Sequence, residues 1–315
     1  MLVAWAALSA VADQPARPAL YHRLQAASVE VLVGRVLAGS GCVVDPDGTV
    51  LTALHMIPPG DASIEIRLPG GQRLPATWIA ADVGHDLALL QLPPREGGYA
   101  ALSLAAAMPA AGTSVSLFGA PLFRHAVLVP GAVARQGTTF EYVNNNYIEV
   151  VHVSGMAAGG FSGGPWVDAQ GAVIGVQSAT MTTKGFQQGI CFAVPVEAVR
   201  GLLATRQSPT TPTLGAAVEE LWEQPAEYVR SLDAEVQGLV AKKAHAQGPA
   251  AAAGIQEGEI ITAIGTQPVV LRDELLRAVW QLPAGDPVTL TVRDRQGQNP
   301  REVVVRLGGL HRPER

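Results

Sequence analysis

The stretch GGFSGGPWVDAQGAVIGV, residues 159–176, places glycines on both sides of a single serine, Ser162, and continues into a valine-rich run. Such a stretch either holds a nucleophile among backbone N–H groups or forms a tight turn around an ordinary polar residue. A serine is a weak nucleophile unless a base takes its proton and an acid orients that base. The stretch alone does not decide between the two interpretations, so the partners must be found elsewhere in the chain.

Composition narrows the class of protein. The chain has 315 residues, enough for two domains, and its 48% hydrophobic and 16% charged residues argue against global disorder. The net charge of −5 and the absence of a Lys/Arg cluster argue against nucleic-acid binding. Cys42 and Cys191 lie far apart without a C-x-x-C pattern, which predicts buried free thiols rather than a disulfide framework or a zinc site.

The N-terminus has two interpretations. Residues 2–12 are apolar or small, and Ala10-Val11-Ala12 before Asp13 resembles a signal-peptidase site, but no Lys or Arg precedes the apolar run. The segment is therefore either a truncated export signal or a disordered leader. No later segment contains the ~18 uncharged apolar residues that a membrane span requires, so we expect no integral span in the mature chain.

The chain divides into two parts with different patterns. From Val29 to about Val194, short β-branched runs alternate with Gly-, Pro- and Asp-containing turns, which predicts a β-sandwich or barrel. Residues 194–206 have helical spacing, and the proline-bearing QSPTTPT is the best candidate linker. The predicted divisions are a leader and N-terminal arm (1–28), a β domain (29–206), a linker (207–213), an α+β module (214–309) and a tail (310–315).

The α+β module combines strands with one amphipathic helix. Strands are predicted in LGAAVEEL, GLVAKKA and GEIITAIGTQPV, and a hairpin over residues 286–307. In LRDELLRAVWQL, residues 271–282, four apolar side chains share one stripe of a predicted helix: Leu271, Leu275, Val279 and Leu282.

A base and an acid for Ser162 are available in the β domain. His55 ends the β run GTVLTALHMI, where its side chain can face a cleft, and Asp86 opens the alternating strand DLALLQL. A buried aspartate at a strand edge can accept the imidazole N–H and fix its tautomer. Each of these residues alone is more often an ordinary one; the combination, in the order His, Asp, Ser, favours nucleophilic catalysis.

These residues lie in stretches that resemble the chymotrypsin-fold serine proteases, and more closely the HtrA/Deg family. The matching stretches follow in family order from about Val29 to Leu307: GSGCVVDPDGTVLTALHMI, AADVGHDLALLQL, FGAPLFRHAVLVPGAV, GGFSGGPWVDAQGAVIGVQSA and GICFAVPVEAVRGLL. The resemblance implies a mainly β protein with a chymotrypsin-like double β-barrel. It also implies that His55 is the general base, Asp86 the orienting acid and Ser162 the nucleophile, with Asp82 as a competing acid.

The resemblance extends to the oxyanion hole and the specificity pocket. It implies that the oxyanion is bound by the N–H groups of Gly160 and Ser162. It places Met156 at the base of the primary pocket, with a wall formed by Ser178, Ala179 and Thr180. None of these pocket residues is acidic, so an apolar residue is expected before the scissile bond rather than Arg or Lys. The alternative for Met156 is plain core filling.

The α+β module resembles a PDZ domain, which binds C-terminal peptides as an added strand. The resemblance implies that the peptide carboxylate is bound by the N–H groups of Leu214, Gly215 and Ala216. It also implies that Leu275 and Val279 help to form the side-chain pocket. The alternative is that these apolar residues serve only as core.

Together these features predict an ATP-independent serine endopeptidase that cleaves unfolded or damaged polypeptides after export to the periplasm or beyond. The resemblance also implies a homotrimer formed through the N-terminal segment of the protease domain, with Tyr21 as an aromatic anchor. No cofactor, metal or nucleic-acid partner is expected, because no motif for one is found. The alternative is a catalytically inactive chaperone or binding protein on the same scaffold.

Overall fold

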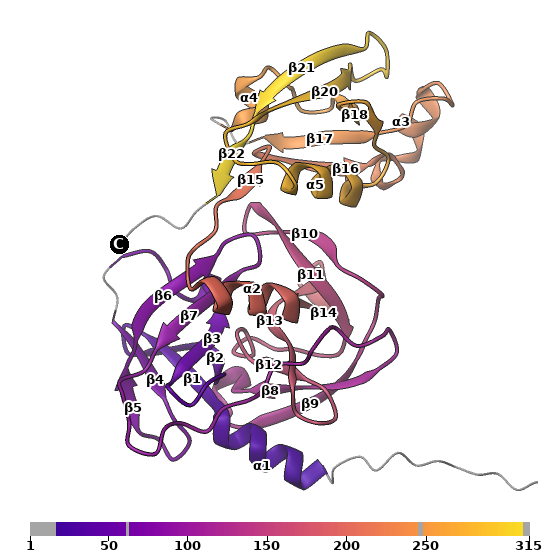
Figure 1. Ribbon diagram of the computed structural model, residues 1–315. Coiled ribbons are helices and arrows are strands. Elements are labelled where there is room, and N and C mark those ends of the chain that lie inside the picture. The colour runs from indigo at the N-terminus through magenta and orange to yellow at the C-terminus, as the bar shows by residue number, and fades with distance from the viewer. Residues whose placement is uncertain (1–16, 61–62, 245–247, 311–315) are drawn as a thin grey trace, which may run out of the picture.

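The computed structural model describes residues 17–60, 63–244 and 248–310. The predicted leader at residues 1–12 and the residues after 310 lie outside this part of the chain. Two curved antiparallel sheets form the β domain, and the α+β module lies beyond them, above β10 in Figure 1. Antiparallel pairing throughout both large sheets agrees with the predicted barrel class.

The first sheet carries the predicted base and acid. Its strand order is β5-β4-β1-β2-β3-β7-β6, with strands β1 Ser28–Val33, β2 Val36–Val43, β3 Thr49–Ala53, β4 Ile64–Arg67, β5 Arg73–Pro75, β6 Thr77–Asp82 and β7 Leu87–Gln91. The strand β3 is buried throughout and pairs with β7 on one side and β2 on the other. The short 3-10 helix η1, Leu54–Met56, follows β3 directly. His55 therefore leaves the sheet beside the turn that joins β6 to β7.

The second sheet carries the serine loop. Its order is β10-β11-β14-β13-β12-β8-β9, and a further β11–β9 pairing closes it; the strands are β8 Ser114–Gly119, β9 Val127–Val133, β10 Thr139–Val143, β11 Asn146–Ser154, β12 Pro165–Val167, β13 Val173–Thr183 and β14 Phe186–Pro195. The loop between β11 and β12 contains Ser162. A second 3-10 helix, η2, spans Pro121–Phe123.

Two helices cover the β domain. The predicted closing helix is confirmed as α2, Val196–Thr205, with Val199 and Leu202 buried. The N-terminal arm contains α1, Arg17–Ala27, which inserts Leu24 into a core cluster. The Tyr21 hydroxyl donates to the Ala126 carbonyl of the same chain, so this predicted trimer anchor already has an internal contact.

The α+β module contains the predicted strands and helix. Its sheet has the order β16-β17-β18-β20-β21 with β19 on β18, and a separate β15–β22 pair joins it to the linker; the elements are β15 Thr211–Thr213, β16 Ala216–Glu220, η3 Leu221–Glu223, α3 Ala226–Ser231, β17 Leu239–Ala244, α4 Pro249–Ala252, β18 Ile260–Ile264, β19 Gln267–Pro268, α5 Arg272–Trp280, β20 Pro287–Arg293, β21 Arg301–Arg306 and β22 Gly308–Leu310. The predicted hairpin is β20–β21.

The helix α5 is shorter than predicted. Leu275 and Val279 are fully buried, whereas Leu271 precedes the helix and is 41% exposed. Leu282 lies after the helix ends. The helix packs against both β16 of its own module and β10 of the β domain, an arrangement visible in Figure 1. The apolar face of α5 thus contributes to the contact between the two parts of the protein.

Candidate functional site

His55 and Asp86 lie together at the first sheet. The Nδ1 atom of His55 is 2.7 Å from Oδ2 of Asp86, and the backbone N–H of His55 donates to Oδ1 at 2.8 Å. Leu54 N–H donates to the Asp86 carbonyl at 3.0 Å, so the backbone before the imidazole is also attached to this aspartate. The imidazole orientation is therefore set by several contacts to one residue.

The carboxylate of Asp86 has a third partner, Ser178, which the sequence predicted only as part of a pocket wall. The hydroxyl of Ser178, on β13, donates to Oδ2 of Asp86 at 2.5 Å. Burial alone lowers the pKa of His55, but the hydrogen bond and the negative charge of Asp86 outweigh it and raise that pKa above 6.5. Asp86 is buried and the His55 side chain is 29% exposed. A buried carboxylate thus contacts an imidazole that is partly exposed.

The loop around Ser162 is held from the first sheet. Ser40, on β2, is fully buried; its N–H donates to the Ser162 carbonyl at 2.8 Å and its hydroxyl to the Gly160 carbonyl at 2.7 Å. The Gly163 N–H donates to the Gln177 carbonyl on β13. Sequence reasoning missed the role of Ser40, for which the only signal was a small polar residue between glycines in GSG. Both sheets therefore fix the position of the loop.

The backbone at Gly160 requires glycine. Its φ of 98° lies in the region that other residues rarely adopt, and a Cβ there would lie 2.5 Å from the Ala120 carbonyl oxygen. Within the described residues, the N–H groups of Gly160 and Ser162 have no acceptor, whereas the Phe161 N–H between them donates to Ala158. The two N–H groups assigned to an oxyanion are thus available to a ligand.

The hydroxyl of Ser162 makes a long hydrogen bond, 3.4 Å, to the Ser178 carbonyl oxygen. Ser178, Ala179 and Thr180 follow one another on β13, which is buried at Ser178 and becomes more exposed beyond it. Met156 is 57% exposed, so the core-filling alternative for this residue is wrong. Its loop is attached to the β13–β14 hairpin, because Gln187 Nε2 donates to the Ala157 carbonyl. The predicted pocket wall, residues 178–180, therefore starts beside Ser162.

The competing acid, Asp82, contacts a different histidine. Its Oδ2 is 2.8 Å from Nδ1 of His85, and Nε2 of His85 is 3.2 Å from Oε2 of Glu149. Burial lowers the pKa of His85, but hydrogen bonds and charge from both carboxylates raise it to about 9. The imidazole of His85 is therefore protonated at neutral pH, unlike a general base, and Asp86 is the carboxylate that contacts His55.

The residues predicted to bind a peptide lie together beside the β domain, and Leu275 and Val279 are fully buried. Leu275 and Val279 face a cluster that includes Leu214, and Gly215 has a φ of 66°. The Gly215 N–H, one of the predicted carboxylate donors, already bonds the Thr213 hydroxyl at 3.0 Å. β16 is an edge strand. Its open side faces the β domain.

Tyr147, on β11, fills that open side. Its hydroxyl donates to the Val218 carbonyl at 2.9 Å and accepts from the Val218 N–H at 2.8 Å. Burial raises the pKa of Tyr147 to about 12, so the hydroxyl stays neutral. A residue of an added peptide strand would use the same N–H and carbonyl. Nothing in the sequence pattern indicated this contact.

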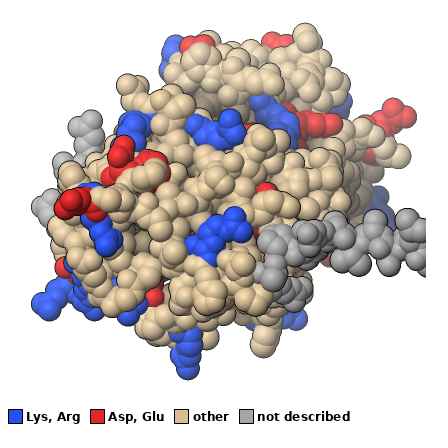
Figure 2. Space-filling view, turned by 60° about the horizontal axis from the view of Figure 1, so that its bottom comes forward, with Lys and Arg blue, Asp and Glu red and all other residues tan. Residues whose placement is uncertain are grey.

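The described residues offer little support for a membrane span, a metal site or a reactive cysteine. The described residues contain no helix long and apolar enough to cross a membrane and no group of three His, Cys, Asp or Glu that would hold a metal ion. Both cysteines are buried free thiols, as predicted, and burial raises the pKa of Cys42 to about 12 and that of Cys191 to about 11. On the face shown in Figure 2, basic and acidic side chains are interspersed.

Models of two protein families match the two parts of the chain. A trypsin-like peptidase domain model matches residues 39–176, and a PDZ domain model matches residues 212–307. A probable periplasmic serine endoprotease DegP-like from Pseudomonas fluorescens is 32% identical over 266 residues, which are 83% of this chain and 54% of that protein. A relative of the same description from Brucella suis is 30% identical over 82% of this chain and 50% of that protein.

The chain therefore combines a trypsin-like peptidase domain with a PDZ domain, and it is similar to DegP-like serine endoproteases. The predicted resemblance, with one C-terminal PDZ domain, is thereby confirmed. The chain spans about half the length of these curated relatives.

Solved structures of the family agree in fold. The HtrA-type protease AlgW with decapeptide superposes with a TM-score of 0.66 at 21% identity, covering 93% of this chain and 98% of that one. The serine endoprotease from Yersinia pestis gives 0.61 at 23% identity, covering 92% and 98%. The predicted fold, a chymotrypsin-like double barrel followed by an α+β PDZ domain, is confirmed.

Proposed function

We propose that this chain is a serine endopeptidase in which Ser162 is the nucleophile, His55 the general base and Asp86 the acid that orients His55. The single observation that carries the proposal is the Asp86 carboxylate, which accepts from the His55 ring, the His55 backbone and Ser178 at once. A carboxylate held in this way fixes the tautomer with Nε2 free to accept a proton and stabilises the imidazolium that forms.

The proposed reaction begins when the Ser162 hydroxyl turns from the Ser178 carbonyl towards Nε2 of His55. Hydrogen bonds of this kind are often long until substrate binds. The oxygen then attacks the peptide carbonyl carbon while its proton passes to His55, and the N–H groups of Gly160 and Ser162 bind the oxyanion. His55 gives the proton to the leaving amine, and water hydrolyses the acyl-enzyme by the same steps in reverse order.

The substrate proposal rests on the residues beside Ser162. Met156 is exposed next to the serine loop, and no acidic side chain occurs among the four predicted pocket residues. We therefore propose cleavage after apolar residues in unfolded or damaged polypeptides, without ATP. The PDZ domain is proposed to bind C-terminal peptides through β16, Leu275 and Val279. Export to the periplasm, as named for the relatives, and a homotrimer are part of the same proposal.

Active-site labelling tests the central claim. A fluorophosphonate probe should label the wild-type protein, and Ser162→Ala should abolish both labelling and casein degradation. Ser154→Ala is the matched control, because Ser154 lies in the same domain outside the serine loop and bonds the Ala132 carbonyl; it should label like wild type. If wild-type protein neither labels nor degrades casein with any activating C-terminal peptide, the chain is an inactive binding protein or chaperone.

A further inference from the structure

The turn that carries Asp86 is an unusual piece of backbone. It runs from Asp82 to Asp86 between β6 and β7 and is called here the acid turn. Asp86 has a φ of 52°, in the left-handed region, which aspartate tolerates but does not favour. The turn hydrogen bond from Asp86 N–H to the Val83 carbonyl is long, 3.4 Å. Such a conformation persists when the surroundings support it.

Support for the acid turn comes from His85, the residue before Asp86. Its ring bridges Asp82 within the turn and Glu149 on β11, and both distances are within hydrogen-bonding range. The Glu149 N–H also donates to the Gly84 carbonyl at 3.0 Å. Burial raises the pKa of Glu149, but hydrogen bonds from His85, Thr138 and Arg277 and the charge of His85 outweigh it and lower that pKa to about 2, so Glu149 remains an anion opposite the imidazolium. The acid turn is thus bound to β11 through both side chain and backbone.

The PDZ domain reaches the same turn from the other side. The Trp280 ring, at the end of α5, meets the His85 ring edge-on, with centroids 5.4 Å apart and planes at 77°. A Cβ on Gly84 would lie 2.8 Å from the Trp280 ring and 2.7 Å from the Thr211 hydroxyl, so only glycine allows this approach. The PDZ helix and the β15 linker strand therefore touch the acid turn directly.

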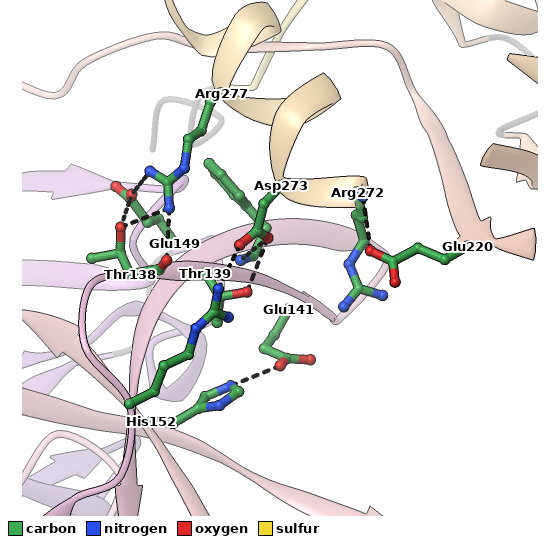
Figure 3. Close-up of polar contacts among 11 residues, drawn as sticks. Thr138, Thr139, Glu141, Glu149, His152, Glu220, Arg272, Asp273 and Arg277 are labelled. Carbon is green, nitrogen blue, oxygen red and sulfur yellow. Dashed lines mark hydrogen bonds and ion pairs between the residues drawn. The ribbon is translucent and has the colours of Figure 1, made fainter. Parts of the chain in front are cut away.

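Charged residues of α5 complete the contact (Figure 3). Arg277 donates to Oε1 of Glu149 at 3.1 Å and to the Thr138 carbonyl at 2.6 Å. One turn earlier, Asp273 accepts from the Thr139 hydroxyl at 2.9 Å and from the Phe140 N–H at 3.2 Å. Glu149 is therefore shared between His85 of the acid turn and Arg277 of the PDZ domain.

We propose that His85 is a positioning residue for Asp86. Through this role, His85 links the docking of PDZ helix α5 to the geometry of the proposed triad. The route runs from Trp280 directly, and from Arg277 through Glu149, to His85 and the backbone of the acid turn. The expected effect on catalysis rests on the proposed peptidase function. The structural link from α5 to Asp86 does not depend on that function.

The consequence for catalysis follows from the contacts of Asp86. If the acid turn relaxes, its carboxylate moves away from the His55 ring and Ser178, and the imidazole loses its fixed tautomer. Of the proposed pocket residues, Ser178 alone bonds this turn; among the described residues, Met156, Ala179 and Thr180 make no hydrogen bond to it. Loss of His85 should therefore lower kcat while KM for a short peptide ester changes little, because only the transition-state geometry suffers.

The test compares three variants of the full chain. His85→Ala removes the link and should lower kcat about 10- to 100-fold. Arg277→Gln changes a residue that is 44% exposed and that contacts the acid turn through Glu149 rather than directly; it should lower kcat about 2- to 30-fold without a folding defect. Glu141→Gln is the control, since it breaks a similar carboxylate–histidine pair, with His152 at 2.8 Å, outside the acid turn and the PDZ contact.

A second measurement separates positioning from general destabilisation. The proton between His55 Nδ1 and Asp86 gives a far-downfield NMR resonance when His55 is protonated. It should shift or broaden in His85→Ala and Arg277→Gln and stay in place in Glu141→Gln. Arg277→Lys, which keeps the cation, should restore both the resonance and most of kcat.

The outcomes distinguish this proposal from the proposed function. If wild type labels with fluorophosphonate but both variants keep wild-type kcat and resonance, the positioning role is wrong and the peptidase proposal stands. If wild type does not label, the peptidase proposal fails, and the resonance alone decides: a shift in Arg277→Gln supports the link, and an unchanged resonance overturns it. An equal loss of kcat in Glu141→Gln would also overturn it.

Discussion

The proposed catalytic site and the PDZ groove differ in what surrounds them. The His55–Asp86 pair has one open side, where a hollow is lined by Leu54, Val83 and the tip of the β10–β11 hairpin. In the PDZ groove, Leu275 and Val279 are fully buried, and Tyr147 of the same hairpin bonds both backbone groups of Val218. The hollow borders His55 and Asp86, whereas Tyr147 occupies the Val218 backbone groups that a peptide strand would use.

The β10–β11 hairpin contacts both regions, the hollow beside His55 and the PDZ residues around α5. β10 and β11 border the hollow beside His55 at their tip and fill the PDZ groove with Phe140 and Tyr147. If the PDZ domain binds peptides as proposed, peptide binding and domain docking compete for α5 and β16. By linkage, a change that loosens the docking would then strengthen peptide binding.

The largest expected effect is on the triad acid. Asp86→Asn should lower kcat/KM by about 10⁴-fold, because an amide in this place favours the wrong imidazole tautomer. Peptide affinity at the PDZ groove, measured by fluorescence anisotropy, should equal that of wild type. Residual activity within tenfold of wild type would mean that Asp86 does not orient the base.

Gly160→Ala should cost about 10²- to 10³-fold in kcat, the effect of losing one oxyanion donor. The positive φ and the nearby Ala120 carbonyl leave no room for a Cβ, so the peptide N–H must turn away. Single-turnover acylation of a peptide ester measures this step. Gly159→Ala is the matched control, because a Cβ there meets open space; equal losses in both variants would contradict the assignment.

The pH profile should report the His55–Asp86 contact. His55 must be neutral to act as a base, and Asp86 raises its pKa above 6.5. Activity should therefore rise with pH through a midpoint above 6.5 and fall about tenfold for each pH unit below that midpoint. A midpoint below 6.5 in the kcat/KM profile would show that burial, rather than Asp86, dominates the pKa of His55.

The smallest expected effect concerns the groove. Tyr147→Phe removes both hydrogen bonds to Val218 but keeps the ring, so a C-terminal peptide should bind up to about tenfold more tightly. Tyr142→Phe is the control: its ring packs against Tyr147, and its buried hydroxyl has no partner among the described residues. Anisotropy titration checks both. Weaker binding to Tyr147→Phe would show that Tyr147 supports the groove instead of covering it.

The sequence by itself determined the two-domain organisation and the candidate residues of each site. Short β-branched runs with intervening turns predict a barrel, because strand alternation and turn chemistry are local properties. The GGFSGG stretch indicated a serine loop, since a glycine such as Gly160 is needed wherever the backbone takes a positive φ near another carbonyl. The order of His55, Asp86 and Ser162 favoured nucleophilic catalysis, and the resemblance of the stretches around them implied the family.

Only the tertiary structure decided how these residues are supported. Ser40 and Ser178 were small polar residues in strands until the fold brought one to the serine loop and the other to Asp86. The contacts of His85, Glu149 and Tyr147 were also not apparent from the sequence, because their partners lie on another strand or in the PDZ domain. Such contacts join residues that are far apart in sequence, and local spacing carries no record of them because burial and hydrogen bonding across domains depend on how the whole chain packs.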